Sequence, residues 1–227
     1  MMSTKKNARI AGLLYLITVL SGIISLVYVP SELIVWENAA ETYNNIVARE
    51  TLFKLSVLSD IILYTTFIFL SLVLFKLLRK TNETIAIVMV VLVLISIPIS
   101  FVNLINKLDV LSIINGTSEL HIKYSEIMAH FESHNNGILV VEIFWGLWLF
   151  PFGYLIYKSE LIPKIMGVFL MLACFGYLAD FFGYFFFPDD FGKTVIPMFA
   201  SITQALGEIG ICLWLLIIGV REKTRPD

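Results

Sequence analysis

The sequence predicts an all-α, polytopic membrane protein: a bundle of six transmembrane helices, with an extra amphipathic helix in the outer loop between spans three and four. Composition is the first observation behind this prediction, because 58% of the 227 residues are hydrophobic and only 15% are charged. Soluble domains usually carry about 25% charged residues. The second observation is six apolar runs, each close to the roughly 20 residues that a helix needs to cross a bilayer. We therefore expect a single transmembrane domain over residues 1–227.

The apolar runs and their flanking residues define the spans in order. Pro30 is expected to stop the first span, whereas Pro163 and Pro197 suit the first turns of spans five and six. The N-terminus resembles a signal peptide, but its apolar run is too long and no clean cleavage site follows, so it is interpreted as a retained first span. Each span must be helical, because the bilayer offers no water to bare backbone groups. The predicted spans are residues 10–29, 52–75, 84–105, 137–157, 163–187 and 197–220.

Lysine and arginine are divided unevenly between the two sides of this bundle. Positively charged loops stay in the cytoplasm, so both termini are predicted to be cytoplasmic, in a bacterial inner or plasma membrane. The richer side holds 11 of the 16 basic residues and the other side holds 5. The richer side comprises Lys5, Lys6, Arg9, Lys76, Arg79, Lys80, Lys158, Lys164, Arg221, Lys223 and Arg225, and the other side comprises Arg49, Lys54, Lys107, Lys123 and Lys193.

The outer loop between spans three and four has helical periodicity. Leu120, Tyr124, Ile127 and Phe131 recur at intervals of three and four residues and form one apolar stripe. The opposite face is charged. The pattern fits an amphipathic helix that lies on the membrane or caps the bundle, and it equally fits a short helix packed on neighbouring loops.

Four acids lie inside the predicted spans: Asp60, Glu142, Asp180 and Glu208. No arginine or lysine lies at comparable depth in these spans, and Lys54 comes closest to Asp60. An ionised carboxylate at the membrane centre costs from about 2.5 to well above 10 kcal/mol, depending on the method. Protonation, contact with water or a bound cation would each lower that cost. A lysine reaching down from the outer rim is a further solution, and the candidates are Lys54, Lys107 and Lys193.

Helical spacing directs these acids into the bundle. Asp180 shares a face with Ala173, Gly176 and Gly183, and small residues in membrane helices mark close helix contacts. The other spans carry similar polar or small stripes, for example Ser96, Ser100, Asn103 and Lys107 in span three. The resulting depths predict an outward-facing acidic cavity. Alternatively, each acid is a neutral carboxyl group hydrogen-bonded to a neighbouring helix.

Histidines occur only in the outer amphipathic region. Glu126, His130 and His134 are spaced four residues apart, so a continuous helix would place them together as candidate metal ligands. Surface helices also carry such residues without binding metal. The sequence has no phosphate-binding loop and no catalytic signature, and its net charge of −2 offers no footprint for nucleic acid. The cofactor is therefore unknown, and the lipid bilayer is the expected partner.

Two stretches carry a family resemblance. The N-terminal ARIAGLLYLIT and the block GLWLFPFGYLIYKSELIPKIMGVFLMLACFGYLAD resemble a bacterial membrane family known as domain of unknown function 4386 (DUF4386). The likeness covers nearly the whole chain. Its motifs are helix-packing patterns, so the resemblance implies a small polytopic membrane protein without an assigned activity, and it supplies no catalytic residues.

Three functions are consistent with these observations. The first is binding or translocation of a proton, a cation or a small cationic molecule by Asp60, Glu142, Asp180 and Glu208. The second is a structural or regulatory subunit without a ligand, whose polar interior specifies helix packing. The third, less favoured because the histidines lie outside the spans, is an intramembrane hydrolase. The sequence leaves the ligand and homo-oligomerisation open.

Overall fold

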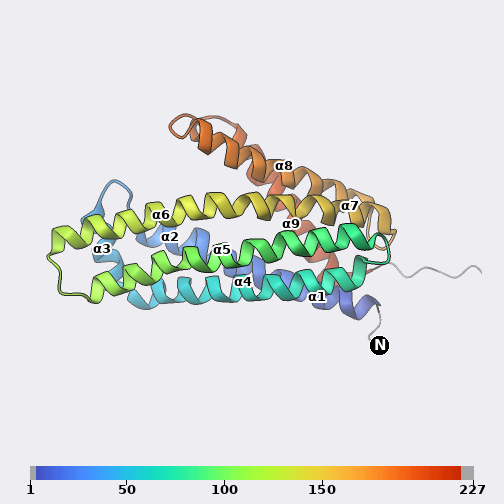
Figure 1. Ribbon diagram of the computed structural model, residues 1–227, viewed down its shortest axis with the longest axis horizontal. Helices are drawn as coiled ribbons and strands as arrows, with labels where there is room; N and C mark the ends of the chain where they lie inside the picture. The colour runs from blue at the N-terminus through green and yellow to red at the C-terminus, as the bar shows by residue number, and fades with distance from the viewer. Residues whose placement is uncertain (1–3, 221–227) are drawn as a thin grey trace, which may run out of the picture. The chain divides into compact units, whose positions relative to one another are not determined.

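The computed structural model describes residues 4–220, and within them it contains helices and no strands (Figure 1). Six helical stretches in this range are long and apolar enough to cross a membrane, as the sequence predicts. Arg221, Lys223 and Arg225, which contribute to the predicted charge asymmetry, lie outside the described residues. The six stretches are Thr4–Leu33, Glu50–Leu78, Glu83–Asn115, Leu120–Ser159, Lys164–Phe186 and Ile196–Ile217.

Two of these stretches consist of more than one helical segment. The first contains α1, a π-helical segment η1 and α2, and the fourth contains α6 and α7. A short helix, α3, also forms in the connection between the first and second stretches. The elements in order are α1 (Thr4–Gly22), η1 (Ile23–Tyr28), α2 (Val29–Leu33), α3 (Ala39–Ala48), α4 (Glu50–Leu78), α5 (Glu83–Asn115), α6 (Leu120–Leu147), α7 (Leu149–Ser159), α8 (Lys164–Phe186), η2 (Phe191–Lys193) and α9 (Ile196–Ile217).

The expectation that Pro30 stops the first helix is wrong. The chain widens into the π-helical segment η1, in which the Val29 N–H donates to the Ile24 carbonyl five residues earlier, and it then continues through Pro30 as α2. Proline at the first turn of a helix loses no intrahelical donor that the turn needs. The change of hydrogen-bond register at η1 gives Pro30 such a first-turn position. The helix therefore changes from π-helical to α-helical hydrogen bonding at this point and does not end.

The extra amphipathic helix between spans three and four is not a separate element. Its residues form the first part of α6, which runs unbroken from Leu120 to Leu147. The helical periodicity was predicted correctly, but a boundary was expected near Gly137. Gly137 lies inside this helix, and Asn103 of α5 occupies the space that a β-carbon at Gly137 would take.

The described chain divides into two compact units. Unit 1 comprises residues 4–16, 66–96 and 140–220, and unit 2 comprises residues 17–65 and 97–139. Four helices, α1, α4, α5 and α6, contribute residues to both units, whereas α7, α8 and α9 belong to unit 1 alone.

Small residues allow the helices of unit 1 to pack closely. α8 packs against α7 and against α9 (Figure 1). Gly167 of α8 and Gly153 of α7 abut with backbone against backbone, and Gly176 leaves room for Ala200 and Thr203 of α9. The predicted contact face of span five is thereby confirmed, since small residues in membrane helices bring backbones together.

Unit 2 has an apolar core of its own. It gathers Val29, Leu33, Ile46, Phe53, Val110, Ile114, Ile127 and Phe131. Ile127 and Phe131 come from the predicted amphipathic stripe, while Leu120 of the same stripe is 54% exposed. Part of the stripe therefore packs on helices of unit 2, and not on loops as a short separate helix would.

Candidate functional site

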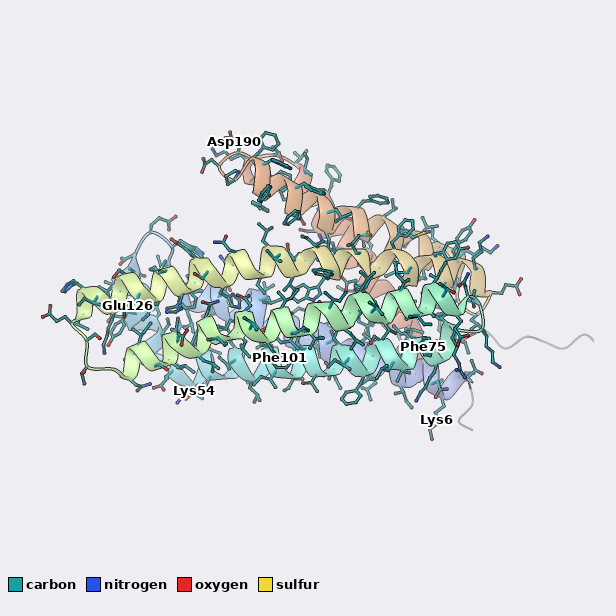
Figure 2. All side chains as sticks on the ribbon, viewed as in Figure 1. Lys6, Lys54, Phe75, Phe101, Glu126 and Asp190 are labelled. Atoms are coloured by element: carbon teal, nitrogen blue, oxygen red, sulfur yellow. The ribbon has the colours of Figure 1, made fainter. Side chains whose placement is uncertain are left out.

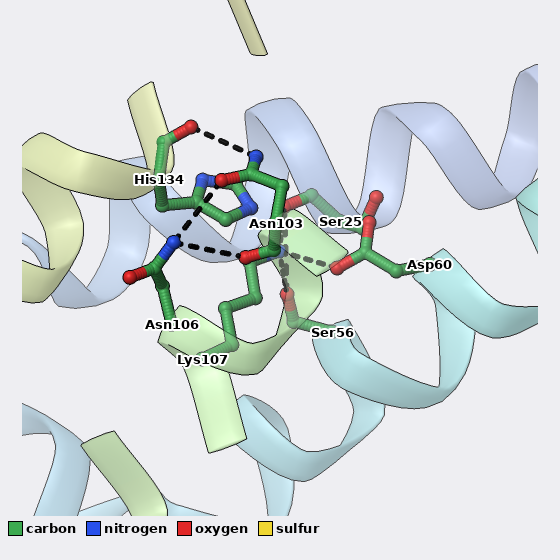
Figure 3. A network of polar contacts seen from close by, with 7 residues as sticks. All are labelled: Ser25, Ser56, Asp60, Asn103, Asn106, Lys107 and His134. Atoms are coloured by element: carbon green, nitrogen blue, oxygen red, sulfur yellow. Dashed lines mark hydrogen bonds and ion pairs between the residues drawn. The ribbon is translucent and has the colours of Figure 1, made fainter. Parts of the chain in front are cut away.

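A buried lysine is the centre of the polar contacts in unit 2 (Figure 3). Lys107 Nζ of α5 donates to Asp60 Oδ2 of α4 at 2.6 Å and to Ser56 Oγ at 2.9 Å. Its third contact is the Ser25 carbonyl oxygen of η1, at 3.2 Å. All four residues are at most 3% exposed. An ammonium group has three donors, so these oxygens satisfy it completely. We call Ser25, Ser56, Asp60 and Lys107 the Lys107 network.

The Ser25 carbonyl is available to Lys107 because of the local sequence. In the register of η1, where Val29 N–H pairs with Ile24 O, the next donor would be residue 30 and its acceptor would be Ser25 O. Residue 30 is proline, which has no N–H. The ammonium of Lys107 and, more weakly, Ser56 Oγ at 3.4 Å occupy the place of the missing donor. The π-helical turn, Pro30 and Lys107 are thus parts of one arrangement.

Several buried polar atoms around this network have no hydrogen-bond partner among residues 4–220. They are Ser25 Oγ, Asp60 Oδ1, the Tyr64 hydroxyl and His134 Nε2. Tyr64 lies close enough to Asp60 for the two to interact electrostatically. His134 likewise lies within electrostatic range of Lys107. Unpaired buried polar atoms are rare in folded proteins, and here they gather around one ion pair.

The histidines do not form the metal site that their spacing allowed. His130 Nδ1 lies 3.3 Å from Asn106 Oδ1 and 3.7 Å from Asp109 Oδ2, while the backbone carbonyl of His134 accepts from Asn103 Nδ2 at 2.9 Å. Glu126 is exposed (Figure 2). Within the part of the chain that the structure describes, no group of three or more such side chains is arranged to hold a metal ion.

A different polar group lies in unit 1, around a carboxyl group of α9. Glu208 accepts hydrogen bonds from the hydroxyl of Tyr177 on α8 at 2.7 Å and from that of Tyr15 on α1 at 3.1 Å. Gly146 of α6 makes room for Tyr177, since a β-carbon there would lie 2.6 Å from Tyr177 Cβ. Two phenol donors on one carboxyl group fix its position between three helices.

The other two acids of unit 1 lie near the same tyrosine. Asp180 Oδ2 accepts from Gln204 Nε2 of α9 at 2.8 Å, and Asp180 Oδ1 has no partner among the described residues. Tyr177 is within electrostatic range of Glu208, Glu142 and Asp180, and Glu142 is within range of Asp180. We call Tyr15, Glu142, Tyr177, Asp180, Gln204 and Glu208 the Glu208 cluster.

The four predicted acids therefore fall into two environments. Asp60 is paired with Lys107, so the expectation that no base lies at its depth is wrong, and of the three lysines considered for such pairing it is Lys107 that forms the contact. Lys54 instead pairs with Glu50 and is 59% exposed (Figure 2). Among residues 4–220, no ion pair involves the acids of the Glu208 cluster.

The sequence predicts Lys107 only as one of three lysines that could reach an acid from the outer rim, because span three is expected to end at residue 105. The signal that could have extended it was present, since Ser96, Ser100, Asn103 and Lys107 share one helical face and α5 runs to Asn115. Tyr15 and Tyr177 were missed as partners of Glu208, because nothing in local spacing links three different helices.

Comparison with known proteins gives a family but no solved relative. Residues 10–219 match the family model described as domain of unknown function (DUF4386). An uncharacterized protein of Archaeoglobus fulgidus is 35% identical over 81 residues, which cover 34% of this chain and 43% of that protein. The chain thus spans less than half of the length of this curated relative. No solved structure matches the chain.

Proposed function

The chain belongs to the DUF4386 family, a family of unknown function, and we propose that it is a membrane protein that binds a proton, a cation or a small cationic molecule at the Glu208 cluster. The observation that carries the proposal is the charge balance of this cluster. Glu142, Asp180 and Glu208 lie around Tyr177, and none of them has an ion pair among residues 4–220. Ionisable groups inside membrane helices are functional candidates by default.

The hydrogen bonds of the cluster support a bound positive charge. Tyr15 and Tyr177 both donate to Glu208, and phenol donors stabilise an ionised carboxylate without neutralising it. The free oxygen of Asp180 is a further acceptor. If all three ionise, the carboxylates repel one another in low dielectric, so a proton or a cation between them would remove a large electrostatic cost.

A structural role without a ligand is the second candidate, and the Lys107 network favours it. That ion pair is complete within the chain and links η1, α4 and α5. Buried ion pairs can specify a packing arrangement without performing any chemistry. The two candidates make different demands on the Glu208 cluster, because only the first requires it to respond to cations.

We also propose the orientation that the basic residues predict, with both termini in the cytoplasm of a bacterial cell and the Glu208 cluster open toward the outside. The observation behind it is the division of the basic residues, 11 against 5. This orientation can be tested by introducing single cysteines between α6 and α8 and labelling them in intact cells. Reaction of a cysteine at position 160 with a membrane-impermeant reagent would contradict this orientation, because residue 160 follows α7 at the predicted inner end.

Thermal unfolding of the purified protein tests cation binding at the Glu208 cluster. Melting should be compared in sodium, potassium, calcium and tetramethylammonium chloride against N-methylglucamine chloride at equal ionic strength and constant pH. We expect at least one cation to raise the melting temperature of the wild type, because a ligand that binds only the folded state stabilises it. Asp180→Asn and Glu208→Gln should abolish the effect. Asp190→Asn, at an exposed pair with Lys193, is the matched control. Proton binding is tested by repeating the melting in N-methylglucamine chloride at acidic and at alkaline pH. Equal melting of the wild type in all salts and at both pH values would refute the proposal.

A further inference from the structure

We propose that the Lys107 network is a second, separate cation site, in which the ammonium of Lys107 is a tethered occupant that a free monovalent cation such as Na⁺ replaces. The proposal concerns unit 2 alone and does not rest on the Glu208 cluster. It starts from the contacts of Lys107, which are all to oxygen atoms: a carboxylate, a hydroxyl and a backbone carbonyl.

This donor set is the one that hard cations prefer. Carboxylate, hydroxyl and carbonyl oxygens bind the alkali and alkaline-earth ions, whereas nitrogen and sulfur suit transition metals. The oxygens that Lys107 does not use are also buried. Asp60 Oδ1 and Ser25 Oγ have no close partner among residues 4–220, their residues are fully buried, and the Tyr64 hydroxyl lies beside the Asp60 carboxylate. Figure 3 shows the second carboxylate oxygen of Asp60 turned away from the ammonium. A free ion at Asp60 would find more oxygen ligands than the lysine takes.

The backbone of η1 is suited to the same task. Helical carbonyls normally accept from the chain itself, but Ser25 O is released by the π-helical turn and by Pro30. Irregular backbone at membrane depth is tolerated where it lines a polar site, and carbonyls of interrupted helices coordinate ions in membrane transporters. π-helical turns are frequent at functional sites. The sequence therefore places the Ser25 carbonyl, which has no donor within its own helix, next to the Asp60 carboxylate.

The charge of the site selects a monovalent ion. Asp60 supplies a single negative charge to the network, and Lys107 balances it. A monovalent cation keeps that balance when the Lys107 ammonium releases its proton to solvent as the ion enters, so that one positive charge replaces another. A divalent ion would leave a net positive charge buried even then, which is costly in low dielectric. His134, close to Lys107, adds no negative charge.

Removing the tether gives the test. Lys107→Met and Lys107→Gln keep the oxygen atoms around Asp60 but remove the lysine that competes for them. Sodium should therefore raise the melting temperatures of both variants. The sodium concentration that gives half of this rise should be at least roughly tenfold lower than in the wild type, because a tethered group competes at high effective concentration. Melting is measured in sodium against N-methylglucamine chloride. Lys107→Gln keeps a donor for Ser56 and the Ser25 carbonyl, so it remains measurable if Lys107→Met fails to fold.

Two controls localise the response. The double variant Lys107→Gln/Asp60→Asn retains the Glu208 cluster but should lose the sodium effect of Lys107→Gln. This loss would show that the sodium effect arises at the Lys107 network and not at the Glu208 cluster. Lys123→Gln removes another buried lysine, whose Nζ donates to the backbone carbonyls of Ile114 and Gly116 and lies 5.9 Å from the centre of the Tyr43 ring. It should gain no sodium effect, because no carboxylate is among these contacts. A Lys107→Gln protein whose melting is the same in both salts, or whose sodium effect survives Asp60→Asn, overturns the proposal.

Discussion

Asp60 in unit 2 and Glu208 in unit 1 are both carboxyl groups in apolar helices, but their neighbours differ. Asp60 faces an ammonium group at 2.6 Å, and Glu208 faces two phenol hydroxyls at 2.7 and 3.1 Å. The first arrangement cancels charge, and the second stabilises charge without cancelling it. The comparison teaches that a carboxylate in a membrane helix says little until its partners on other helices are known. Asp60 is neutralised by a cation of the chain itself, whereas the partners of Glu208 are hydroxyl donors that carry no charge.

The largest expected effect comes from breaking the Lys107 network. Lys107→Met leaves Asp60 buried and unpaired, which should lower the free energy of unfolding by about 3–5 kcal/mol. The measurement is denaturant or thermal unfolding in a sodium-free buffer. Glu208→Gln removes no ionic partner and should cost far less. If both substitutions cost the same, the two environments do not differ as described.

Lys123→Met is the matched control for Lys107→Met. Both lysines are buried, but Lys123 donates only to two backbone carbonyls. Its loss should cost about 1–3 kcal/mol, the penalty for unpaired neutral acceptors. A cost equal to that of Lys107→Met would mean that burial of the lysine stem, and not the pairing of Asp60, determines the loss.

Packing in unit 1 gives the next effect. Gly146→Ala places a β-carbon 2.6 Å from Tyr177 Cβ, so Tyr177 must move away from Glu208. Overpacking of this kind costs about 1–3 kcal/mol, and unfolding of the purified variant measures it. Gly210→Ala is the control, because its nearest neighbour is the flexible Met166 side chain at 3.7 Å. Equal losses in the two variants would contradict the tight contact at Gly146.

The fold was predicted more fully than the site, for physical reasons. Apolar length and flanking prolines are local properties, so the six spans were visible in the sequence. Asp60 and Lys107 lie on different helices and are 47 positions apart in the sequence, so no local pattern predicts their pairing. Helical spacing predicts the stripe that ends in Lys107, but the polar residues at the end of span three are also typical of a membrane boundary. α5 in fact continues to Asn115.

The same limit explains the error at Pro30. Proline normally ends or kinks a helix because it lacks a donor, and local rules therefore placed the end of span one there. The structure supplies the missing donor from Lys107, which comes from another part of the chain. A tertiary contact has overridden a reliable local signal, and it has done so at one of the candidate sites.

Pro30→Ala tests that explanation. The new N–H can donate to Ser25 O within the helix, so the carbonyl depends less on Lys107. We expect Pro30→Ala to reduce the cost of Lys107→Met by about 1 kcal/mol, the net value of one hydrogen bond. The double-mutant cycle is measured by unfolding. Strict additivity of the two substitutions would show that Pro30 and Lys107 act independently.

The smallest effect distinguishes the two phenols of the Glu208 cluster. Tyr177→Phe removes a donor at 2.7 Å from Glu208, and Tyr15→Phe removes one at 3.1 Å. Hydrogen bonds between membrane helices average about 0.6 kcal/mol, and the shorter bond should be worth more. Unfolding of both variants measures the difference, with Tyr184→Phe, whose ring stacks edge-on against Phe191, as the control. Because the phenols hold the carboxylate without neutralising it, both substitutions should also weaken any cation response of the wild type. A larger loss of stability in Tyr15→Phe than in Tyr177→Phe would reverse this assignment of the two donors.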